Sequence, residues 1–327
     1  MSSGKVAIVF GGAGFIGTHL IRELRATSQY SRIVIADIRP PVEGPVEGVE
    51  HVRCDVRDPI GIAGPFDNAE VYNLGAIHTT PGHQDWEYFN TNVHGAININ
   101  RFAESIGAKV LLFTSSISVY GPTEEARDES GPLMPESAYG RSKQMAEEIH
   151  RLWQQSSPDR RLVIVRPAVI FGAGESGNFT RLAKALKAGT FAYPGRRDTI
   201  KSCGYVGELV RTMLFMRDQD RPEVTYNFAY PERYNSEQIC EAFHRVGGFS
   251  KPKFVIPLGF MLAVGFAFEV LAALGLKTSV NRARVLKLVK STNIIPGQLM
   301  KLGYRFETDL ESGLRSWKDE RQAKGFV

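Results

Sequence analysis

An apolar strand that runs directly into a glycine-rich turn constrains the fold of this chain more than any other feature. Residues 6–10, VAIVF, form the continuous apolar, β-branched run that is typical of a strand buried in a parallel sheet. The turn GGAGFIG at 11–17 follows at once, and a stretch of helical pattern follows at 18–27. Glycines in such a turn let backbone amides approach a pyrophosphate, and the N-terminus of the next helix favours its negative charge. Taken alone the signal is weak, because a tight strand–helix turn needs glycine even without a ligand.

The same alternation of apolar runs and helical stretches continues to residue 166. Short apolar runs predict further strands, and two long stretches of helical period predict helices. The predicted strands are 33–36, 51–54, 70–74, 109–114 and 162–166, and the predicted helices are 88–106 and 138–155. Strands that alternate with helices predict an α/β fold with a Rossmann-type, doubly wound parallel sheet.

An acidic residue at the end of the second predicted strand strengthens the nucleotide interpretation. Asp37 lies 20 residues beyond Gly17, where a carboxylate accepts the hydroxyls of an adenosine ribose. A carboxylate there also repels the 2′-phosphate of NADP, although Arg39 lies two residues further on. The sequence therefore predicts NAD as the cofactor.

The alternation weakens after Phe171, where glycine and proline are scattered among short helices and strands. We therefore expect residues 1–176, together with 200–227, to form the NAD-binding Rossmann domain. Residues 177–199 and 228–327 are expected to form a smaller α/β domain that binds the substrate.

The segment YGRSK carries a candidate acid–base pair. Tyr139 and Lys143 are four residues apart on a predicted helix, so both side chains lie on one helix face. Free tyrosine titrates at about 10, too high for a base at neutral pH. A nearby ammonium group and a positively charged nicotinamide would lower that pKa. The YxxxK pattern also occurs by chance in many helices, so the pair needs the cofactor motif beside it.

Composition limits the partners and the compartment. The formal net charge is +5, and the sequence has no run of Lys or Arg. An anionic small-molecule ligand explains this charge as well as a merely basic surface does. No nucleic-acid partner is expected. The three cysteines have no spacing typical of a metal or disulfide site, which favours a reducing, cytoplasmic environment and predicts no metal.

One apolar segment, 258–276, needs a separate interpretation. Its length approaches that of a membrane span, but Glu269 lies within it and would be costly in lipid. We expect a buried helix of the C-terminal domain and no integral membrane span. Peripheral contact with a membrane remains the alternative.

Together these motifs resemble the extended short-chain dehydrogenases/reductases, within them the NAD-dependent nucleotide-sugar epimerase/dehydratase family. The resemblance covers nearly the whole chain. The matching stretches, in order, are GGAGFIG at 11–17, IADIRP at 35–40, CDV at 54–56, NLGA at 73–76, NTNVHG at 90–95, LLFTSSISVYG at 111–121, PESAYGRSK at 135–143, VRPAVIFG at 165–172 and KLGYRFETDLESGL at 301–314.

The resemblance implies roles for residues at matching positions. Ser116 would hydrogen-bond the reacting hydroxyl, with Tyr139 and Lys143 completing the catalytic set. Ser116, Ser118, Asn178 and Lys201 would contact the substrate. The implied cofactor-binding residues are Gly11, Gly14, Phe15, Ile16, Gly17, Asp37, Asp55, Val56, Leu74, Ala76, Asn92, Tyr139, Lys143, Pro167 and Val169.

The two residues that follow Ser116 reduce the number of candidate reactions. Sugar dehydratases and decarboxylases similar to this chain carry an acid in that stretch, whereas Ile117 and Ser118 stand here. The resemblance therefore favours an epimerase that acts at C4 of a UDP-sugar through a 4-keto intermediate. A 3β-hydroxysteroid, sterol or sugar dehydrogenase is the first alternative, and a non-catalytic NAD-binding regulator on the same fold is the second. Apolar faces on the helices near 90–106 and 138–155 resemble a family dimer interface, so we expect a homodimer.

Overall fold

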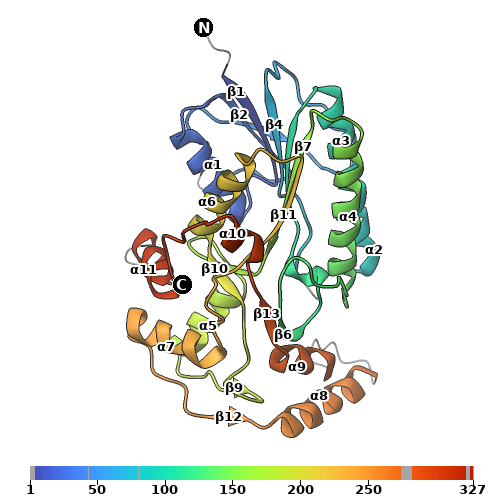
Figure 1. The fold of residues 1–327 in the computed structure, drawn as a ribbon. Coiled ribbons are helices and arrows are strands. Elements are labelled where there is room, and N and C mark those ends of the chain that lie inside the picture. The colour runs from blue at the N-terminus through green and yellow to red at the C-terminus, as the bar shows by residue number, and fades with distance from the viewer. Residues whose placement is uncertain (1–3, 43, 80–81, 274–281, 322–324, 327) are drawn as a thin grey trace.

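Seven parallel strands form the central sheet of the computed structural model, which describes residues 4–42, 44–79, 82–273, 282–321 and 325–326 (Figure 1). Their order across the sheet is β11-β7-β5-β4-β1-β2-β3. The strands are β1 (Lys5–Phe10), β2 (Tyr30–Asp37), β3 (Glu50–Arg53), β4 (Ala69–Asn73), β5 (Val110–Thr114), β7 (Arg161–Pro167) and β11 (Glu223–Phe228). The order reverses between β1 and β4, which is the switch point where a doubly wound sheet opens a crevice for a ligand.

Side chains of β1 show how both faces of the sheet are covered. Val6, Ile8 and Phe10 join one core cluster, whereas Ala7 and Val9 join another, because alternate residues of a strand point to opposite faces. Helices α3 (Gly95–Ser105) and α4 (Ala138–Gln155) cover the first face, and α1 (Phe15–Ala26) and α6 (Val206–Arg217) cover the second (Figure 1). The Rossmann-type parallel sheet predicted from sequence is thus present.

The helix predicted at 88–106 is divided into three parts. Helix α2 (Asp85–Tyr88) leads into a π-helical segment, η1 (Phe89–His94), and α3 follows. Single wide turns of this kind are frequent at functional sites. Here the wide turn contains Asn92, whose side chain is buried.

The remaining elements surround a second, aromatic core. Phe171, Phe179, Phe243 and Trp317 are among its fully buried members. The remaining strands form three two-stranded sheets. Most of the remaining helices lie beyond the carboxyl edge of the central sheet (Figure 1). The strand pairs are β8 (Val169–Phe171) with β10 (Cys203–Tyr205), β9 (Tyr193–Pro194) with β12 (Val255–Ile256), and β6 (Thr123–Arg127) with β13 (Thr292–Ile294). The further helices are the 3-10 turn η2 (Ile117–Val119), α5 (Asn178–Lys187), α7 (Ser236–Gly247), α8 (Leu258–Ala273), α9 (Arg282–Val289), α10 (Gly297–Lys301) and α11 (Leu310–Glu320).

The prediction of a buried helix at 258–276 is wrong for the residues that the structure describes. Helix α8 is exposed along most of its length, with Phe260 64% and Phe266 53% exposed. It packs against α9 at one end of the molecule and not within the aromatic core (Figure 1). An apolar sequence predicts that a helix prefers an apolar contact, but it does not show whether the same chain provides one. Residues 274–276 lie outside the described residues, and no helix among the described residues is long and apolar enough to cross a membrane.

Candidate active site

The glycine-rich turn lies at the switch point of the sheet, directly against the end of β4. Gly11 has φ +74°, and a Cβ on it would lie 2.7 Å from backbone atoms of Leu74 and Gly75. A Cβ on Gly17 would lie 2.6 Å from the Gly11 carbonyl oxygen. Only glycine fits at both positions, because real Cβ atoms do not approach backbone atoms so closely. Gly14 precedes Phe15 and Ile16 in the first turn of α1, so the turn presents backbone amides at a helix N-terminus.

Asp37 ends β2 beside this turn, and its side chain is buried. One carboxylate oxygen accepts a hydrogen bond from the Ala13 backbone N–H at 3.1 Å, and the other accepts from the Arg39 N–H at 3.0 Å. A close backbone approach and an oriented carboxylate are the two features that binding of an NAD pyrophosphate and ribose requires. The residues present therefore fit NAD. Among the described residues, no cluster of three or more His, Cys, Asp or Glu side chains is arranged to hold a metal ion.

Two more predicted cofactor positions follow β3. The Asp55 carboxylate is paired with the Arg57 guanidinium, at 2.9 Å from Nε and 2.5 Å from Nη2, and this pairing lowers its pKa. Val56 is buried where a Cβ on Gly95, at the start of α3, would touch it at 2.8 Å. The segment after β3 is thus fixed against α3, on the side of the sheet occupied by α4.

Asn92 links the loop after β4 to the helix that carries the candidate acid–base pair. Its side-chain oxygen accepts from the Ile77 N–H at 3.0 Å, and its amide nitrogen donates to the Ser142 hydroxyl at 2.9 Å. Ser142 precedes Lys143 in α4. Asn92 therefore fixes the position of the loop that contains Leu74 and Ala76 relative to α4.

Ser116 and Tyr139 meet at the carboxyl edge of the sheet. Ser116 follows β5 and caps η2, where its hydroxyl accepts from the Ser118 N–H at 3.1 Å and donates to the Ser118 hydroxyl at 3.1 Å. A Cβ on Gly140 would lie 2.5 Å from the Ser118 carbonyl oxygen, so glycine allows the start of α4 to rest on η2. This contact brings the Tyr139 hydroxyl within hydrogen-bonding reach of Ser116.

Burial controls the charge on both members of the YxxxK pair. Burial raises the pKa of Tyr139 to about 12, although the Ser116 hydrogen bond lowers it. Burial also lowers the pKa of Lys143 to about 7. The Lys143 Nζ donates to the Thr114 carbonyl oxygen at 2.7 Å and lies 4.7 Å above the Phe113 ring. Burial is thus the largest influence on the Tyr139 pKa, and the Lys143 ammonium group is directed toward the end of β5. The expectation that Lys143 and a bound nicotinamide together lower this pKa stays a prediction.

A buried glutamate supports Lys143, and sequence reasoning missed it. Glu147 lies one helical turn beyond Lys143, and its negative charge opposes the lowering of the Lys143 pKa. Its carboxylate accepts from Arg166 Nε at 2.9 Å, from Arg166 Nη2 at 2.7 Å and from the Ser115 hydroxyl at 2.6 Å. In the sequence Glu147 looks like an exposed helical glutamate beside Glu148. Its spacing of four from Lys143 was the available signal.

The ends of β7 and β8 complete this edge of the sheet. Pro167 ends β7, and the Val169 N–H donates to the Ser202 carbonyl oxygen at 3.2 Å. Phe15 packs edge-to-face on His19 with ring centroids 5.6 Å apart, and the His19 Nε2 lies 2.9 Å from the Ala173 carbonyl oxygen. The first turns of α1 therefore contact the loop after β8.

Two predicted substrate residues have partners elsewhere in the fold. Asn178 is exposed at the start of α5, where its side-chain oxygen accepts from Arg181 at 2.6 Å. Lys201 donates to the Lys290 carbonyl oxygen at 2.7 Å, and burial lowers its pKa to about 8. The Asn178 contact stays within α5, whereas the Lys201 contact ties that residue to the segment that follows α9.

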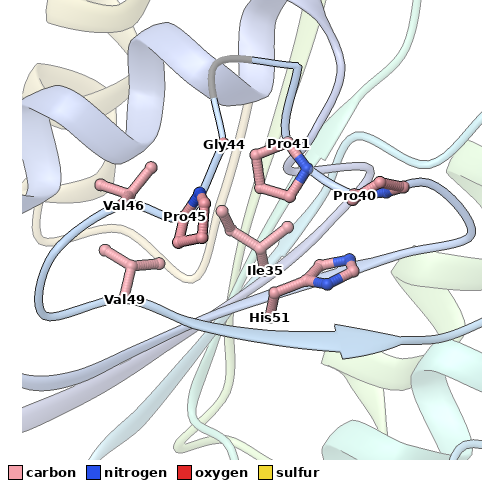
Figure 2. Close-up of a pocket in the computed structure, with 8 residues that line it drawn as sticks. All are labelled: Ile35, Pro40, Pro41, Gly44, Pro45, Val46, Val49 and His51. Carbon is pink, nitrogen blue, oxygen red and sulfur yellow. The ribbon is translucent and has the colours of Figure 1, made fainter.

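A hollow beside β2 is distinct from this site. Figure 2 shows its lining, which is apolar except for His51 and comes mostly from the proline-rich loop after β2. None of the cofactor or catalytic residues predicted from sequence lines it. The candidate site is therefore the carboxyl edge of the sheet, along which the glycine turn, Asp37 and the Ser116–Tyr139 pair lie.

Comparisons with known proteins show the family to which the chain belongs. A sequence model described as the NAD dependent epimerase/dehydratase family matches residues 7–229. The chain is 28% identical over 310 residues to N-acetyl-alpha-D-glucosaminyl-diphospho-ditrans,octacis-undecaprenol 4-epimerase of Escherichia coli O157:H7, covering 94% of this chain and 92% of that protein. It is 24% identical to a decarboxylating sterol-4-alpha-carboxylate 3-dehydrogenase of Candida albicans, covering 96% and 97%.

Solved structures share the fold. UDP-glucose 4-epimerase of Thermus thermophilus in complex with NAD superposes with a TM-score of 0.75 at 20% identity, covering 97% of this chain and 99% of that chain. The family match spans more than half of the chain and contains the glycine turn, Asp37 and the YxxxK pair. The chain belongs to the NAD-dependent epimerase/dehydratase family, and it is an enzyme of the extended short-chain dehydrogenase/reductase type with NAD as its cofactor.

Proposed function

We propose that this enzyme inverts C4 of a sugar linked to a diphosphate, through a 4-keto intermediate, and that a UDP-sugar is its first candidate substrate. The observation that carries the proposal is the hydrogen-bonded Ser116–Tyr139 pair beside the NAD turn, with Lys143 one helical turn from Tyr139. Ile117 and Ser118 provide no acid for expelling water. A site with one proton carrier suits an alcohol–ketone interconversion better than a dehydration.

Each residue at this edge has a defined task in that reaction. When NAD is bound, it would supply the acceptor for the C4 hydride and the source of its return. Ser116 holds the C4 hydroxyl by a hydrogen bond, while Tyr139 removes its proton as the C4–H bond breaks. After the ketone turns its other face to the cofactor, Tyr139 returns the same proton to the oxygen. Because burial raises the Tyr139 pKa to about 12, the phenolate needs the positive charge of Lys143 and of the oxidised cofactor.

The other assignments belong to the same proposal. Residues 1–176 and 200–227 hold NAD, with Asp37 at the adenosine ribose and Asp55 and Val56 at the adenine. Leu74, Ala76, Pro167 and Val169 lie along the cofactor, and Asn92 braces α4. Residues 177–199 and 228–327 bind the sugar and its diphosphate, with Asn178 as a contact. Ser118 and Lys201 contact the substrate from the NAD-binding part of the chain.

A lipid-linked sugar diphosphate is the second candidate substrate. It is supported by the relative from Escherichia coli O157:H7, whose name gives an undecaprenol-linked substrate and which aligns with nearly the full chain. The exposed apolar helix α8, in the part of the fold proposed to bind substrate, also favours it. Both candidates present the same sugar and diphosphate to the protein, and they differ in whether a nucleoside or a lipid is attached to the far phosphate.

A test is to denature the purified protein and identify the released nucleotide, then to offer the intact enzyme three substrates. These are UDP-glucose, UDP-N-acetylglucosamine and N-acetylglucosaminyl-diphospho-undecaprenol. Bound NAD and a C4 epimer without net NADH support the proposal, and the best substrate separates the two candidates. Accumulated NADH, with a sugar or a sterol, would indicate a dehydrogenase, and bound NAD without turnover on any substrate would indicate a regulator.

Assembly as a homodimer is proposed from helix α4. Met145 and Leu152 are 48% and 66% exposed, and they are seven residues apart on the face of α4 turned away from the sheet. Two exposed apolar side chains at heptad spacing form the seam by which helices pair.

A further inference from the structure

Helices α8 and α9 present large apolar side chains that no other part of the described chain covers. Phe254, which precedes β12, is 75% exposed, and Phe260, Phe266 and Phe268 of α8 and Leu286 and Leu288 of α9 are also exposed. We call these six side chains the apolar tip. Isolated exposed apolar residues are ordinary, but a group of this size marks a surface that contacts something apolar.

The tip is attached firmly to the body of the protein. Val285 of α9 is buried, and a Cβ on Gly195 would lie 2.5 Å from Val289, so α9 rests on the turn after β9. Arg282 of α9 links this helix to α8. Its Nε lies 2.9 Å from the Glu269 carboxylate, and its guanidinium lies 5.2 Å from the Phe266 ring centroid. The single acidic residue of α8 is thereby neutralised.

Positive charge is concentrated in the part of the sequence that contains the tip. Residues 251–290 carry seven Lys or Arg and one acidic residue, a net charge of +6. The other 287 residues carry 33 basic and 34 acidic residues. The whole positive excess of the chain therefore lies in this segment. Lys251, Lys253, Arg282 and Lys290 are exposed cations of this segment, and Arg282 lies over the Phe266 ring. Lys251, Arg282 and Lys290 also form ion pairs, with Glu241, Glu269 and Glu136.

We propose that the apolar tip docks on a bilayer that contains anionic lipids, with its phenylalanine and leucine side chains in the interface and the surrounding cations at the headgroups. Exposed aromatic and aliphatic side chains together with Lys and Arg are the combination by which a helix lies in a membrane surface. The described part of α8 has 16 residues, about 24 Å of helix, which is shorter than a hydrocarbon core of about 30 Å. Among the described residues the proposal therefore places α8 in the membrane surface.

Charge favours a bilayer over a second copy of the chain as the occupant. A symmetric dimer through this face would bring together two segments that each carry a net charge of +6 in the sequence, and these would repel. Anionic lipid headgroups would instead neutralise the exposed cations. Helix α8 is apolar on all sides. A flat protein partner would cover one side of it, whereas lipids can contact each of its exposed sides.

The tip lies close to residues proposed for the substrate. Lys290, at the end of α9, accepts a hydrogen bond from Lys201 through its carbonyl and lies 3.4 Å from Glu136, three residues before Tyr139. Figure 1 shows α8 and α9 at the end of the molecule below β6 and β13, so a docked tip turns this end toward the membrane. The docking proposal stands on exposure and charge and does not depend on the reaction.

The test is co-sedimentation of the full-length protein with vesicles of phosphatidylcholine, with or without phosphatidylglycerol, and without any sugar. Wild type is expected to bind the mixed vesicles and to release as salt rises, because salt screens the headgroup charges. The variant F260E/F266E should bind at least about tenfold less, since removal of one buried Phe from the interface costs a tenfold factor or more. Met300→Glu, an exposed apolar residue on α10 away from the tip, is the matched control and should bind like wild type.

Circular dichroism and the amount of bound NAD show whether F260E/F266E folds, and Phe260→Glu alone is the milder second variant. The proposal is overturned if wild type binds neither vesicle, or if both folded tip variants bind as wild type does. It is also overturned if wild type is a dimer in solution that Phe260→Glu converts to a monomer, because a second copy would then cover the tip.

Discussion

At the scale of single residues, the site depends on groups whose charge is set by burial. Tyr139 has a raised pKa and Lys143 a lowered one, so neither is poised for catalysis by its own surroundings. The Glu147 carboxylate favours the ammonium form of Lys143, and in the proposed complex the positive charge of oxidised NAD would favour the phenolate of Tyr139. We therefore expect the pair to become active only in the complex with oxidised NAD.

Removing the Tyr139 hydroxyl tests the proton carrier. Tyr139→Phe should lower turnover on the order of 10²-fold or more, a typical loss when acid–base catalysis is removed, with NAD still bound. The measurement is turnover on the accepted substrate, with the released nucleotide assayed in parallel. Tyr88→Phe makes the same chemical change on a ring 6.2 Å away, whose hydroxyl bonds the Thr79 carbonyl, and should lose far less. Near-normal turnover of Tyr139→Phe would remove this residue from the mechanism.

Glu147 and Glu148 provide a comparison between adjacent glutamates. Glu147→Gln leaves the buried Arg166 guanidinium without its counter-charge and should lower the free energy of unfolding by about 3 kcal/mol. Glu148 is exposed and pairs with Arg151 at the surface, so Glu148→Gln should change it by less than about 1 kcal/mol. Urea unfolding of both variants measures the difference. Equal losses would mean that the buried network around Glu147 contributes nothing special to stability.

At the scale of elements, the turn after β1 couples two strands and the cofactor. Its glycines are fixed by close backbone contact with the end of β4, so the turn cannot relax independently of the sheet. The π-helical turn before α3 acts similarly, because it places Asn92 between the loop after β4 and α4. These elements position the site before any ligand binds.

Two glycines with the same φ angle allow the cost of backbone strain to be measured separately from the cost of a steric clash. Gly11 and Gly48 both have φ +74°, but a Cβ on Gly11 meets backbone at 2.7 Å, whereas a Cβ on Gly48 meets nothing within 4 Å. Gly48→Ala should cost only the backbone strain, about 1–2 kcal/mol. Gly11→Ala should cost more and also lose bound NAD, because the turn must move away from β4. Thermal unfolding and nucleotide release measure both effects, and equal behaviour of the two variants would contradict the role given to the turn.

The elements also show how much of the fold and the site the sequence could predict. Short continuous apolar runs bounded by turns predicted most of the parallel strands and the type of sheet, because a strand covered on both faces needs apolar residues throughout. Strand β11 was missed, since EVTYNF alternates polar and apolar residues at the edge of the sheet. Helix α8 was placed in the core wrongly, because exposure depends on which neighbours fold against it. Tyr139 and Lys143 were found by their spacing, whereas the spacing of Glu147 from Lys143 gains meaning only once its buried partners, Arg166 and Ser115, are known.

At the scale of the whole molecule, charge and exposed apolar surface are distributed unevenly. The positive excess lies in residues 251–290 of the sequence, while Met145 and Leu152, of the proposed dimer interface, are exposed on α4. The two surfaces are separate, so a dimer through α4 leaves the apolar tip uncovered. The proposed assembly and the proposed docking can therefore be tested independently.

Leu152→Glu tests the dimer. The substitution places a charge in the seam of α4 and should convert a dimeric protein to a monomer, as measured by analytical ultracentrifugation. Trp86→Glu, at an exposed apolar residue of α2, is the control and should leave the assembly unchanged. A wild-type monomer, or a dimer that survives Leu152→Glu, would contradict the proposed interface.

The most direct test of the central claim follows the hydrogen at C4. The enzyme is incubated in ordinary water with its best substrate carrying deuterium at C4, and the products are examined by NMR and by absorbance for NADH. A hydride that leaves and returns within one site predicts the C4 epimer with deuterium retained at C4 and no net NADH. Loss of deuterium to water, or deuterium accumulating in free reduced cofactor beside a ketone, would contradict the proposed epimerisation.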